Sequence, residues 1–204
     1  SKIFAMNNEF RSQPGIMDVG TGNSYPGGGN VNLNLFNAES KNGHVDKAID
    51  CYGIDEHYLS SLGIPIVKGR NFSGLSDTNH SILVNEATVK FFFFFAPIGK
   101  HVTFPGDTSS NYLEVVGVMK NFNQKSLYNA IEPLLLFYGP NNNIIQLKLN
   151  KADIKGSIAK AETIWKKYFS QLPFEYKFLD EDFNSQYAAD QKRGKIFAAF
   201  SILT

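Results

Sequence analysis

The chain has 204 residues, of which 43% are hydrophobic and 19% are charged, and its formal net charge is +1. This length and this apolar content suit one domain, or one domain of two lobes, with a buried core. The near-neutral charge gives no electrostatic basis for nucleic-acid binding. The single cysteine, Cys51, excludes an internal disulfide framework and a cysteine-rich zinc site.

The first part of the chain predicts one helix and several short strands. Apolar residues recur at spacings of three and four over residues 2–12, which indicates an amphipathic helix, and Pro14 ends it. Residues 23–30 contain Pro26 and three consecutive glycines, so we expect a surface loop without regular structure. This loop lacks the Lys-Ser/Thr ending of a phosphate-binding loop. Strands are expected over 16–21, 31–36 and 47–52, and a polar turn over 37–46.

The strongest turn signals lie in residues 62–73, which have the sequence LGIPIVKGRNFS. They predict the end of a helix, a turn into a short strand, and a tight turn at Gly69, where we expect a positive φ. The helix that precedes them covers residues 55–62, with Asp55 as a candidate N-cap. Cys51 precedes that helix in a strand-like setting, so we expect a buried small apolar residue and not a reactive thiol.

The middle of the chain is rich in strand signals, at 81–84, 101–104, 112–119 and 132–137. Asn85 is the expected N-cap of a helix that follows the first of these strands. Five consecutive phenylalanines, 91–95, come next. Adjacent side chains point in different directions on any regular element, so some of these rings must be exposed or contact a partner or a membrane surface.

The C-terminal part predicts a strand, a long helix and a second short strand. Residues 144–149 alternate apolar and polar side chains, and 153–169 carry an apolar stripe at helical spacing that includes Trp165, which we expect in the core. A strand is expected over 174–178. Asp180 is the expected cap of a last helix.

A basic cluster and an apolar run close the sequence. Lys192, Arg193 and Lys195 precede residues 196–203, a run that is too short to cross a bilayer. We expect the truncated start of a membrane helix here, and therefore a fragment of a longer protein. The alternative is a buried C-terminal helix of a complete soluble domain.

The search for chemistry predicts no catalytic, cofactor-binding or metal-binding residue. The histidines make no pair at a metal-ligand spacing, and no Gly-x-Ser-x-Gly nucleophile motif occurs; they are His44, His57, His80 and His101. Asp180, Glu181 and Asp182 are explained as residues of the first turn of a helix, with a paired-carboxylate hydrolase as the alternative. Arg70 follows the turn at Gly69, where we expect a structural salt bridge.

Several motifs together resemble the periplasmic core domain of MacB/FtsX-type ABC transporter permeases. They occur in the family's order and spacing; they are residues 62–73, 82–87 (ILVNEA), 97–100 (PIGK), 115–122 (VVGVMKNF) and 131–133 (IEP). The resemblance covers nearly the whole chain. Residues 91–95 depart from the family pattern, which usually has a Gly-Trp type of turn before the PIGK motif.

The resemblance implies an α+β fold with two lobes. A porter-like lobe of βαβ units would be built from both chain ends, residues 1–60 and 143–190, and a mostly-β lobe, residues 61–142, would be inserted between them. Residues 191–204 would begin a truncated transmembrane helix.

The resemblance also implies a non-enzymatic domain on the periplasmic side of the bacterial inner membrane. A cytoplasmic ABC ATPase would hydrolyse ATP, and membrane helices on both sides of this domain would carry the motion to it for export, lipoprotein handling or signalling. A periplasmic partner or a homodimer mate would meet the domain outside the membrane. The alternatives are a free-standing periplasmic ligand-binding module and the carboxylate hydrolase.

Overall fold

A computed structural model of the chain describes residues 2–29, 31–40, 43–92, 95–106, 112–125, 130–139 and 142–179. Its α-helices are α1 (Lys2–Arg11), α2 (Tyr58–Leu62), α3 (Glu86–Phe91) and α4 (Ile154–Tyr168), and two short 3-10 helices are η1 (Leu75–Asp77) and η2 (Lys151–Asp153). The strands of its first half are β1 (Ile16–Gly22), β2 (Ser24–Tyr25), β3 (Gly28–Gly29), β4 (Asn32–Ser40), β5 (Gly43–Ile54) and β6 (Ile66–Gly69). Those of its second half are β7 (Ser81–Asn85), β8 (His101–Thr103), β9 (Leu113–Met119), β10 (Leu134–Tyr138) and β11 (Ile144–Leu149).

Six strands close on themselves and form a ring, which we call the strand ring. β4 pairs with β5 and β8, β8 pairs with β9, β9 pairs with β7, and β10 joins β7 to β5. The β7–β9 and β5–β10 pairs are parallel and the other pairs are antiparallel. Closure leaves these strands with paired neighbours on both sides, and it encloses a core.

Alternation along the strands divides the apolar side chains of the ring into two clusters. Ile82 and Leu135 belong to the enclosed cluster, which also takes Phe36 from β4 and Ile49 from β5. Leu83, next to Ile82 in the chain, belongs to a second cluster on the opposite face, and that cluster includes two residues of α2, Tyr58 and Leu59. The period of two thus gives β5, β7, β9 and β10 one face toward each cluster.

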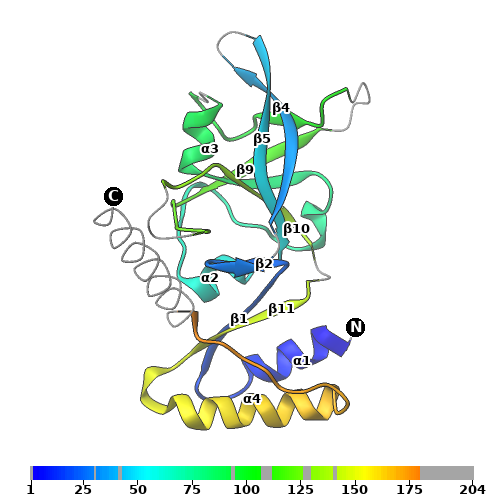
Figure 1. The fold of residues 1–204 in the computed structure, drawn as a ribbon, viewed down its shortest axis with the longest axis vertical. Coiled ribbons are helices and arrows are strands. Elements are labelled where there is room, and N and C mark those ends of the chain that lie inside the picture. The colour runs from blue at the N-terminus through cyan, green and yellow to red at the C-terminus, as the bar shows by residue number, and fades with distance from the viewer. Residues whose placement is uncertain are drawn as a thin grey trace, which may run out of the picture.

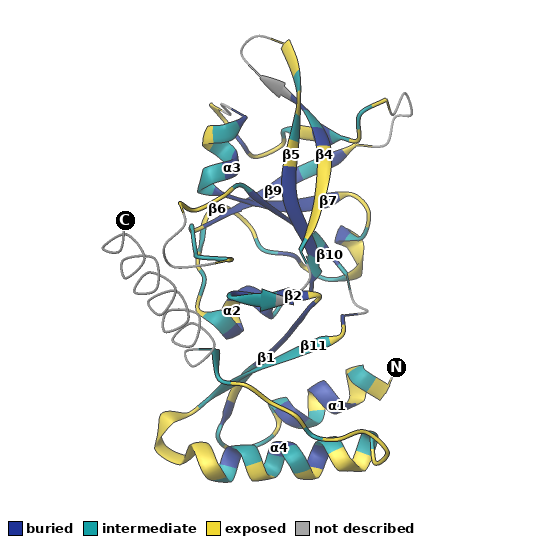
Figure 2. Cartoon of the chain, in the orientation of Figure 1, coloured by how far each residue is buried: buried dark blue, intermediate teal, exposed yellow. Residues whose placement is uncertain are grey.

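A second lobe is built from both ends of the described chain; we call it the helical lobe. It contains α1, α4 and the antiparallel pair β1–β11, which runs from Ile16↔Leu149 to Gly22↔Ile144 with a register shift between Ile16 and Asp18. Figure 1 shows α1 and α4 on one side of this pair and the strand ring on the other. Residues of α1, β1 and α4 form its core, and the buried bands of these elements in Figure 2 face one another; the core consists of Met6, Phe10, Ile16, Val19, Ala161 and Ile164.

The packing of residues 32–54 differs from the expected division at residue 60. Phe36, Ala38, Ile49 and Cys51 all lie in the enclosed core of the strand ring. The contacts of β4 and β5 therefore place them in one unit with the strands that follow residue 61. They do not form a unit with α1 and β1. The reason is that β5 pairs with β10 over its C-terminal half, which sequence periodicity does not reveal.

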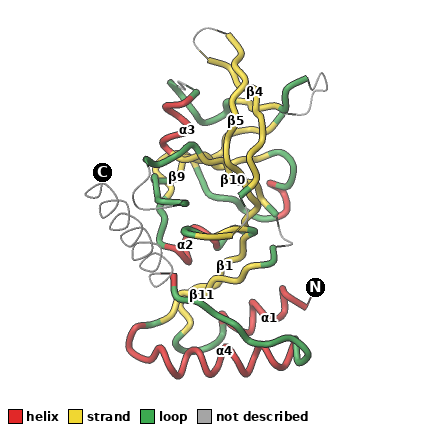
Figure 3. The backbone as a smooth tube through the Cα atoms, in the orientation of Figure 1, coloured by secondary structure: helices red, strands yellow, loops and turns green. Residues whose placement is uncertain are grey.

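Two expected elements differ in the structure. Residues 23–30 were expected to be loop only, but β2 and β3 form a short hairpin around Pro26 and Gly27, whose φ of 88° fits a turn that glycine favours. Residues 174–178 were expected to be a strand, but they form none, and Figure 3 shows loop after α4. Their apolar alternation is instead used in side-chain packing: the rings of Phe174 and Tyr176 are 5.7 Å apart.

Other expectations are confirmed. The helices at 2–12 and 153–169 correspond to α1 and α4, and the side chain of Asn85 caps α3 by accepting a hydrogen bond from Thr88 N. One further expectation, the turn at 37–46, is wrong: β4 continues to Ser40 and β5 begins at Gly43, and the two strands pair from Asn32↔Cys51 to Ser40↔Gly43 as one long hairpin. Asp180 lies outside the described residues.

The phenylalanine run is divided between core and surface. Phe92 is fully buried in the strand ring, and the partly buried Phe91 packs against the same core with the ammonium of Lys47 4.8 Å from its ring centre. Phe95 is 95% exposed. Exposure of part of the run, as expected, is confirmed; Phe93 and Phe94 lie outside the described residues.

No helix in the described ranges is long and apolar enough to cross a membrane. The run at 196–203, expected to begin a membrane helix, lies outside those ranges.

The turn at Gly69 has the expected positive φ, at 70°. A Cβ atom at this position would overlap the carbonyl oxygen of Val116 in β9, because β6 approaches β9 closely there.

Gly69→Val is therefore expected to lower the free energy of unfolding by about 3 kcal/mol or more, since a left-handed backbone and a clash with main-chain atoms act together. The matched control is Gly99→Val: Gly99 also has a positive φ, of 79°, but nothing lies within 4 Å of an added Cβ. Its cost should be limited to the conformational term, about 1–2 kcal/mol. Urea denaturation of both variants measures the difference, and equal losses would contradict the role of the β6–β9 approach.

Candidate functional site

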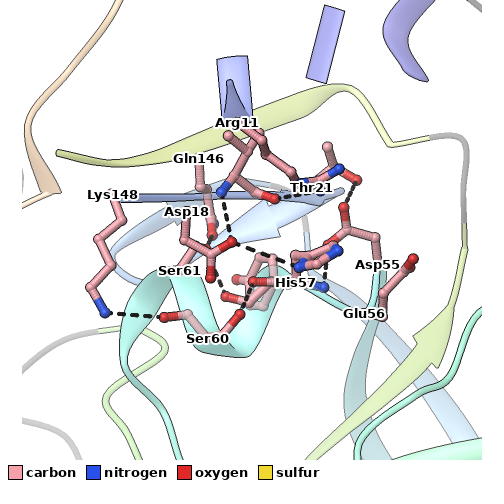
Figure 4. A network of polar contacts seen from close by, with 12 residues as sticks. Arg11, Asp18, Thr21, Asp55, Glu56, His57, Ser60, Ser61, Gln146 and Lys148 are labelled. Carbon is pink, nitrogen blue, oxygen red and sulfur yellow. Dashed lines mark hydrogen bonds and ion pairs between the residues drawn. The ribbon is translucent and has the colours of Figure 1, made fainter. Parts of the chain in front are cut away.

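The candidate site is the junction where α2 rests on the β1–β11 pair, between the helical lobe and the strand ring (Figure 4). Two glycines of β1 make this contact possible. A Cβ at Gly20 would lie 2.6 Å from Tyr58 Cα and 2.9 Å from His57 O, and a Cβ at Gly22 would lie 2.8 Å from Tyr58 Cδ2. Only hydrogen atoms at these positions leave room for α2, so the glycines fix how closely the helix approaches the strand.

Polar side chains surround this contact. Ser61 Oγ donates to Tyr58 O at 2.8 Å and to Gln146 Oε1 at 3.3 Å, and Lys148 Nζ donates to Ser60 O at 3.3 Å. Gln146 and Lys148 alternate on β11 with the apolar residues that face α4. The two faces of the β1–β11 pair are therefore different: one is apolar and covered by α1 and α4, and the other is polar and covered by α2.

A histidine–carboxylate contact, which is an ion pair only when His57 is protonated, lies on the solvent side of the same junction. His57 Nδ1 lies 3.7 Å from Asp18 Oδ1, which also accepts a hydrogen bond from Val19 N at 2.8 Å. The side chain of His57 is 39% exposed and that of Asp18 is 20% exposed, so water screens the pair and its contribution to stability is small.

A buried carboxyl group ties the start of α2 to the end of β1. Thr21 Oγ1 donates to Asp55 Oδ2 at 2.9 Å, and the backbone N–H of His57 donates to Asp55 Oδ1 at 3.1 Å. Asn142 Nδ2 donates to Thr21 O and Thr21 Oγ1, both at 3.1 Å. Burial raises the pKa of Asp55, and the hydrogen bonds from Thr21 and His57 oppose part of that rise.

A chain of hydroxyl and amide groups continues from α2 to the β2–β3 hairpin. The hydroxyls of Tyr52 and Tyr58 are 3.1 Å apart; Tyr52 donates to Gln124 Oε1 at 2.9 Å and Tyr58 donates to Ser24 O at 3.0 Å. Gln124 Nε2 donates to Ser24 Oγ at 3.2 Å. Burial raises the pKa of Tyr58 to about 12 and that of Tyr52 well above its usual range, so both remain neutral donors.

The arrangement suits a mechanical contact better than a reaction centre. Both oxygens of Asp55 already accept hydrogen bonds, and the side chain is 8% exposed, so it has little access to a substrate. Two buried polar atoms at the junction have no hydrogen-bond partner, Asn142 Oδ1 and Gln146 Nε2. An unpaired buried polar group costs free energy, so these two atoms are unfavourable contributions to the packing of the junction.

The structure disperses the residues that the sequence search considered. His44 Nδ1 lies 2.9 Å from Asn37 Oδ1 on the β4–β5 hairpin, and the ring of His101 stacks on Tyr112 at 3.7 Å. Within the described ranges, no group of three or more His, Cys, Asp and Glu residues could hold a metal ion. Cys51 is buried, as expected, and burial raises its pKa. Residues 180–182 lie outside the described ranges.

Arg70 makes the expected structural salt bridge. Its Nη2 donates to Asp77 Oδ1 at 2.7 Å and its Nη1 donates to Asp77 Oδ2 at 3.0 Å. Asp77, which is 1% exposed, also accepts from Ser73 N and Ser73 Oγ. The Arg70 guanidinium holds the pKa of Asp77 well below the usual carboxyl range.

The sequence search missed the junction because each of its residues is common in isolation. The sequence did contain one indication of the junction: Gly20 and Gly22 lie on either side of Thr21 in β1, and therefore on the same face of the strand. Two glycines on one face of a strand indicate the close approach of another element. Nothing in the sequence showed that the other element would be α2.

The chain matches a known family over most of its length. The sequence model of the family described as MacB-like periplasmic core domain matches residues 14–155. No curated protein matches the chain.

Three solved structures share the fold. The periplasmic region of MacB from Actinobacillus actinomycetemcomitans is 18% identical, with a TM-score of 0.54 over 80% of this chain and 72% of that one. The extracellular domain of the noncanonic ABC-type transporter YknZ from Gram-positive bacteria is 15% identical, with a TM-score of 0.53 over 81% and 83%. A domain of a putative permease protein from Porphyromonas gingivalis is 14% identical, with a TM-score of 0.56 over 84% of each chain. The expected α+β fold of the MacB type is thereby confirmed.

Gly20→Ala tests the seat of α2 on β1. Because the added methyl group meets main-chain atoms of α2, which cannot move aside as a side chain can, we expect a loss of about 2–3 kcal/mol in the free energy of unfolding. The matched control is Gly139→Ala, where the nearest atom to an added Cβ is Asn142 Oδ1 at 3.6 Å, so the change should be within about 1 kcal/mol. Urea denaturation followed by circular dichroism distinguishes them; a neutral Gly20→Ala would show that α2 is not held against β1.

Asp77→Asn tests the salt bridge between the buried Asp77 and the half-exposed Arg70 through its pH dependence. At pH 7 we expect a loss of roughly 2–3 kcal/mol, since the Arg70 guanidinium loses its anionic partner. A lowered pKa in the folded state means that the carboxylate stabilises the fold fully above the unfolded pKa of about 4, and that this contribution is lost as the pH falls further.

The difference between Asp77→Asn and the parent should therefore narrow below about pH 4. Denaturation at several pH values measures it, with Glu162→Gln as the control, because Glu162 pairs with Lys166 on the surface of α4 and should change stability by under about 0.5 kcal/mol. A pH-independent difference would contradict the assignment.

Proposed function

Because the chain belongs to the family of MacB-like periplasmic core domains, we propose that it couples ATP hydrolysis in the cytoplasm to a conformational change outside the membrane. It is the extracytoplasmic core domain of a MacB-like ABC transporter permease. The finer proposal is that the helical lobe and the strand ring move relative to each other, with the α2 junction as the hinge. Export, lipoprotein handling and signalling are the outputs we consider.

The observation that carries this proposal is the narrow connection between the lobes. β1 and β11 pair along their whole length within the helical lobe, but β1 meets β5 of the strand ring by strand pairing at Gly22↔Ile54. Around that point, α2 contributes Tyr58 and Leu59 to the ring's outer core while its backbone rests on Gly20 of β1. A rotation of the helical lobe would therefore act on α2 first.

The polar contacts of the junction suit a hinge. Lys148 to Ser60 and His57 to Asp18 are long, partly exposed contacts, which exchange with water at little cost. Asp55 and Thr21, in contrast, make short buried hydrogen bonds that would keep the strand end attached to the start of α2. One end of the contact would hold while the other opens, which is the geometry of hinge motion.

The proposal includes partners and a location. A cytoplasmic ABC ATPase would act through membrane helices on both sides of the domain, and residues 191–204 would begin one of them. A periplasmic protein or a homodimer mate would receive the motion. We propose no catalytic role for the domain itself, and the periplasmic face of a bacterial inner membrane as its location.

Electron-spin distance measurements on the full-length permease with its ATPase test the hinge. Spin labels are placed on Lys155→Cys, on the exposed side of α4, and on Leu33→Cys, which is 66% exposed on β4. Cys51, the single natural cysteine of the 204-residue chain, is buried and should remain unlabelled. Trapping the ATPase with ATP should shift this distance by several ångströms, as expected for domain rotation.

A label pair within the strand ring, Leu33→Cys with Tyr112→Cys, is the control and should keep its distance. An unchanged distance between the lobes in the ATP-trapped and nucleotide-free states would overturn the hinge. An equal change in the distances of both label pairs would indicate deformation of the strand ring and not a hinge motion between the lobes.

A further inference from the structure

A glutamine in the loop after β9 holds the β2–β3 hairpin; we call this contact the Gln124 clamp. Gln124 Nε2 donates to Ser24 Oγ at 3.2 Å and to Tyr25 O at 3.1 Å. On the main chain, Gln124 O accepts from Gly27 N at 2.8 Å. Because Tyr25 O can only accept a hydrogen bond, the amide nitrogen must face the hairpin, and the amide oxygen faces the other way and accepts from Tyr52 of β5. The side chain therefore uses its N–H groups on the hairpin and its oxygen on the strand ring.

The hairpin has little stability of its own. Each of its strands has two residues, which pair as Ser24↔Gly29 and Tyr25↔Gly28. An isolated two-stranded hairpin is at best marginally stable in water. A contact from Tyr58 Oη to Ser24 O, at 3.0 Å, holds the side that lies beside α2 (Figure 1). The position of the hairpin thus depends on the clamp and on α2.

The loop that carries Gln124 is fixed to the strand ring on both sides of this residue. Before it, Asn121 N donates at 3.0 Å to Glu86 Oε2 of α3, a helix that packs on the enclosed core through Phe91. After it, Lys125 Nζ lies 2.7 Å from Asp50 Oδ2 of β5. The clamp therefore has a firm base on the strand ring.

The hairpin lies in the first stretch of chain that passes from the helical lobe to the strand ring. β1 ends at Gly22, where it pairs with Ile54 of β5, and β4 begins at Asn32. Residues 23–31 could span up to about 30 Å if they were released and extended. A connection of that length would let the helical lobe move without moving the ring. When the clamp holds the connection, Gly22 is the point where the chain can turn.

We propose that Gln124 is a positioning residue of the hinge: its clamp keeps the β2–β3 hairpin attached to the strand ring, so that the lobes pivot at Gly22. The inference deepens the proposed function and rests on it, because it assigns a residue that controls the same hinge. The seat of α2 on Gly20 holds β1 before the pivot, and the clamp holds the chain after it. Without the clamp, we expect the lobes to sample a wider range of orientations.

Amide hydrogen exchange of the 204-residue chain, followed by NMR, tests whether the clamp holds the hairpin. In Gln124→Ala the Gly27 amide should exchange about tenfold faster than in the parent, since the loss of the side-chain hydrogen bonds makes local opening easier. Amides of β10, in the strand ring, should keep their exchange rates, which separates local release from global unfolding. The matched control is Gln13→Ala: Gln13 Nε2 donates to Glu9 O at the end of α1, far from the hairpin in sequence, and its loss should leave Gly27 unchanged.

Spin-label distances in the same chain test whether the clamp controls the lobes. The labels are those of the hinge experiment, on Lys155→Cys and Leu33→Cys, and no ATPase is present. Gln124→Ala should broaden the distribution of distances between the lobes by several ångströms, as expected when a hinge loses its fixed pivot. Gln13→Ala should leave the distribution as it is in the parent.

Gln124→Glu is a second variant, of nearly the same shape, that separates the hydrogen bonds from packing. At neutral pH its carboxylate has no donor for Tyr25 O, so the distribution should be broad. Below about pH 4 the protonated acid supplies an O–H donor, and the width should return toward that of the parent at the same pH. The parent is measured at each pH because other titratable groups lie at the junction: Asp18, Asp55, Glu56 and His57.

Four results would each overturn the proposal: equal Gly27 exchange in Gln124→Ala and the parent, equal acceleration at Gly27 and in β10, an unchanged distance distribution, or no recovery of Gln124→Glu in acid. The hinge has its own test in the ATP-driven shift of the full-length permease. That shift together with an unchanged distribution in Gln124→Ala would retain the hinge and reject the clamp. A broadened distribution without an ATP-driven shift would reject the hinge, and with it the role of Gln124 in the motion.

Discussion

The close approach of α2 to β1 is the contact on which the arrangement of the two lobes depends. Gly20 and Gly22 leave main-chain atoms of β1 uncovered, and α2 occupies that space with the backbone of His57 and Tyr58 and the ring of Tyr58. α2 is a helix of five residues, which has little stability by itself. It is held because Tyr58 and Leu59 are buried in the second apolar cluster, on the outer face of the strand ring, while the other side of the helix meets the β1–β11 pair.

Closure of the strand ring explains why motion between the two lobes would be concentrated at the small contact between α2 and β1. A closed set of six strands with an enclosed apolar core resists deformation more than an open sheet does, because each strand is paired on both sides. The helical lobe is also a unit, with its own core between α1, α4 and the β1–β11 pair. Two stiff units joined at a narrow connection concentrate any relative motion at the connection, and the coupling to ATP hydrolysis that we propose would need that property.

The polar groups at the junction divide into firm and weak contacts. The hydrogen bonds among Asp55, Thr21 and Asn142 are buried, and removing one partner would leave the others unpaired. The contacts of Lys148 with Ser60 and of His57 with Asp18 are longer and more exposed to water. Desolvation keeps Tyr52 and Tyr58 neutral, so the chain of hydroxyl groups toward the β2–β3 hairpin acts through hydrogen bonding alone. These contacts can join the two lobes without a nucleophile or a metal ion.

Local signals in the sequence determined the elements and several of their details. The spacing of apolar residues identified α1, α4 and most of the strands, the side chain of Asn85 identified the start of α3, and Gly69 had to adopt a positive φ. These features depend on interactions between near neighbours in the chain. Five ordered motifs also indicated the family, because their order and spacing reflect the whole fold.

Tertiary structure alone decided which elements meet. β5 pairs with β10 through residues that are far apart in the sequence, such as Asp50 and Leu134, so residues 32–54 join the strand ring, and no periodicity within either strand encodes that choice. The same holds at the junction: Gly20, Ser61 and Gln146 are unremarkable where they stand in the chain, and they gain a role only when α2 is packed onto β1 and β11. Residues 174–178 have the alternation of a strand, but a strand also needs a partner with free hydrogen-bonding groups. They form no strand, and the ring of Phe174 packs against Trp165.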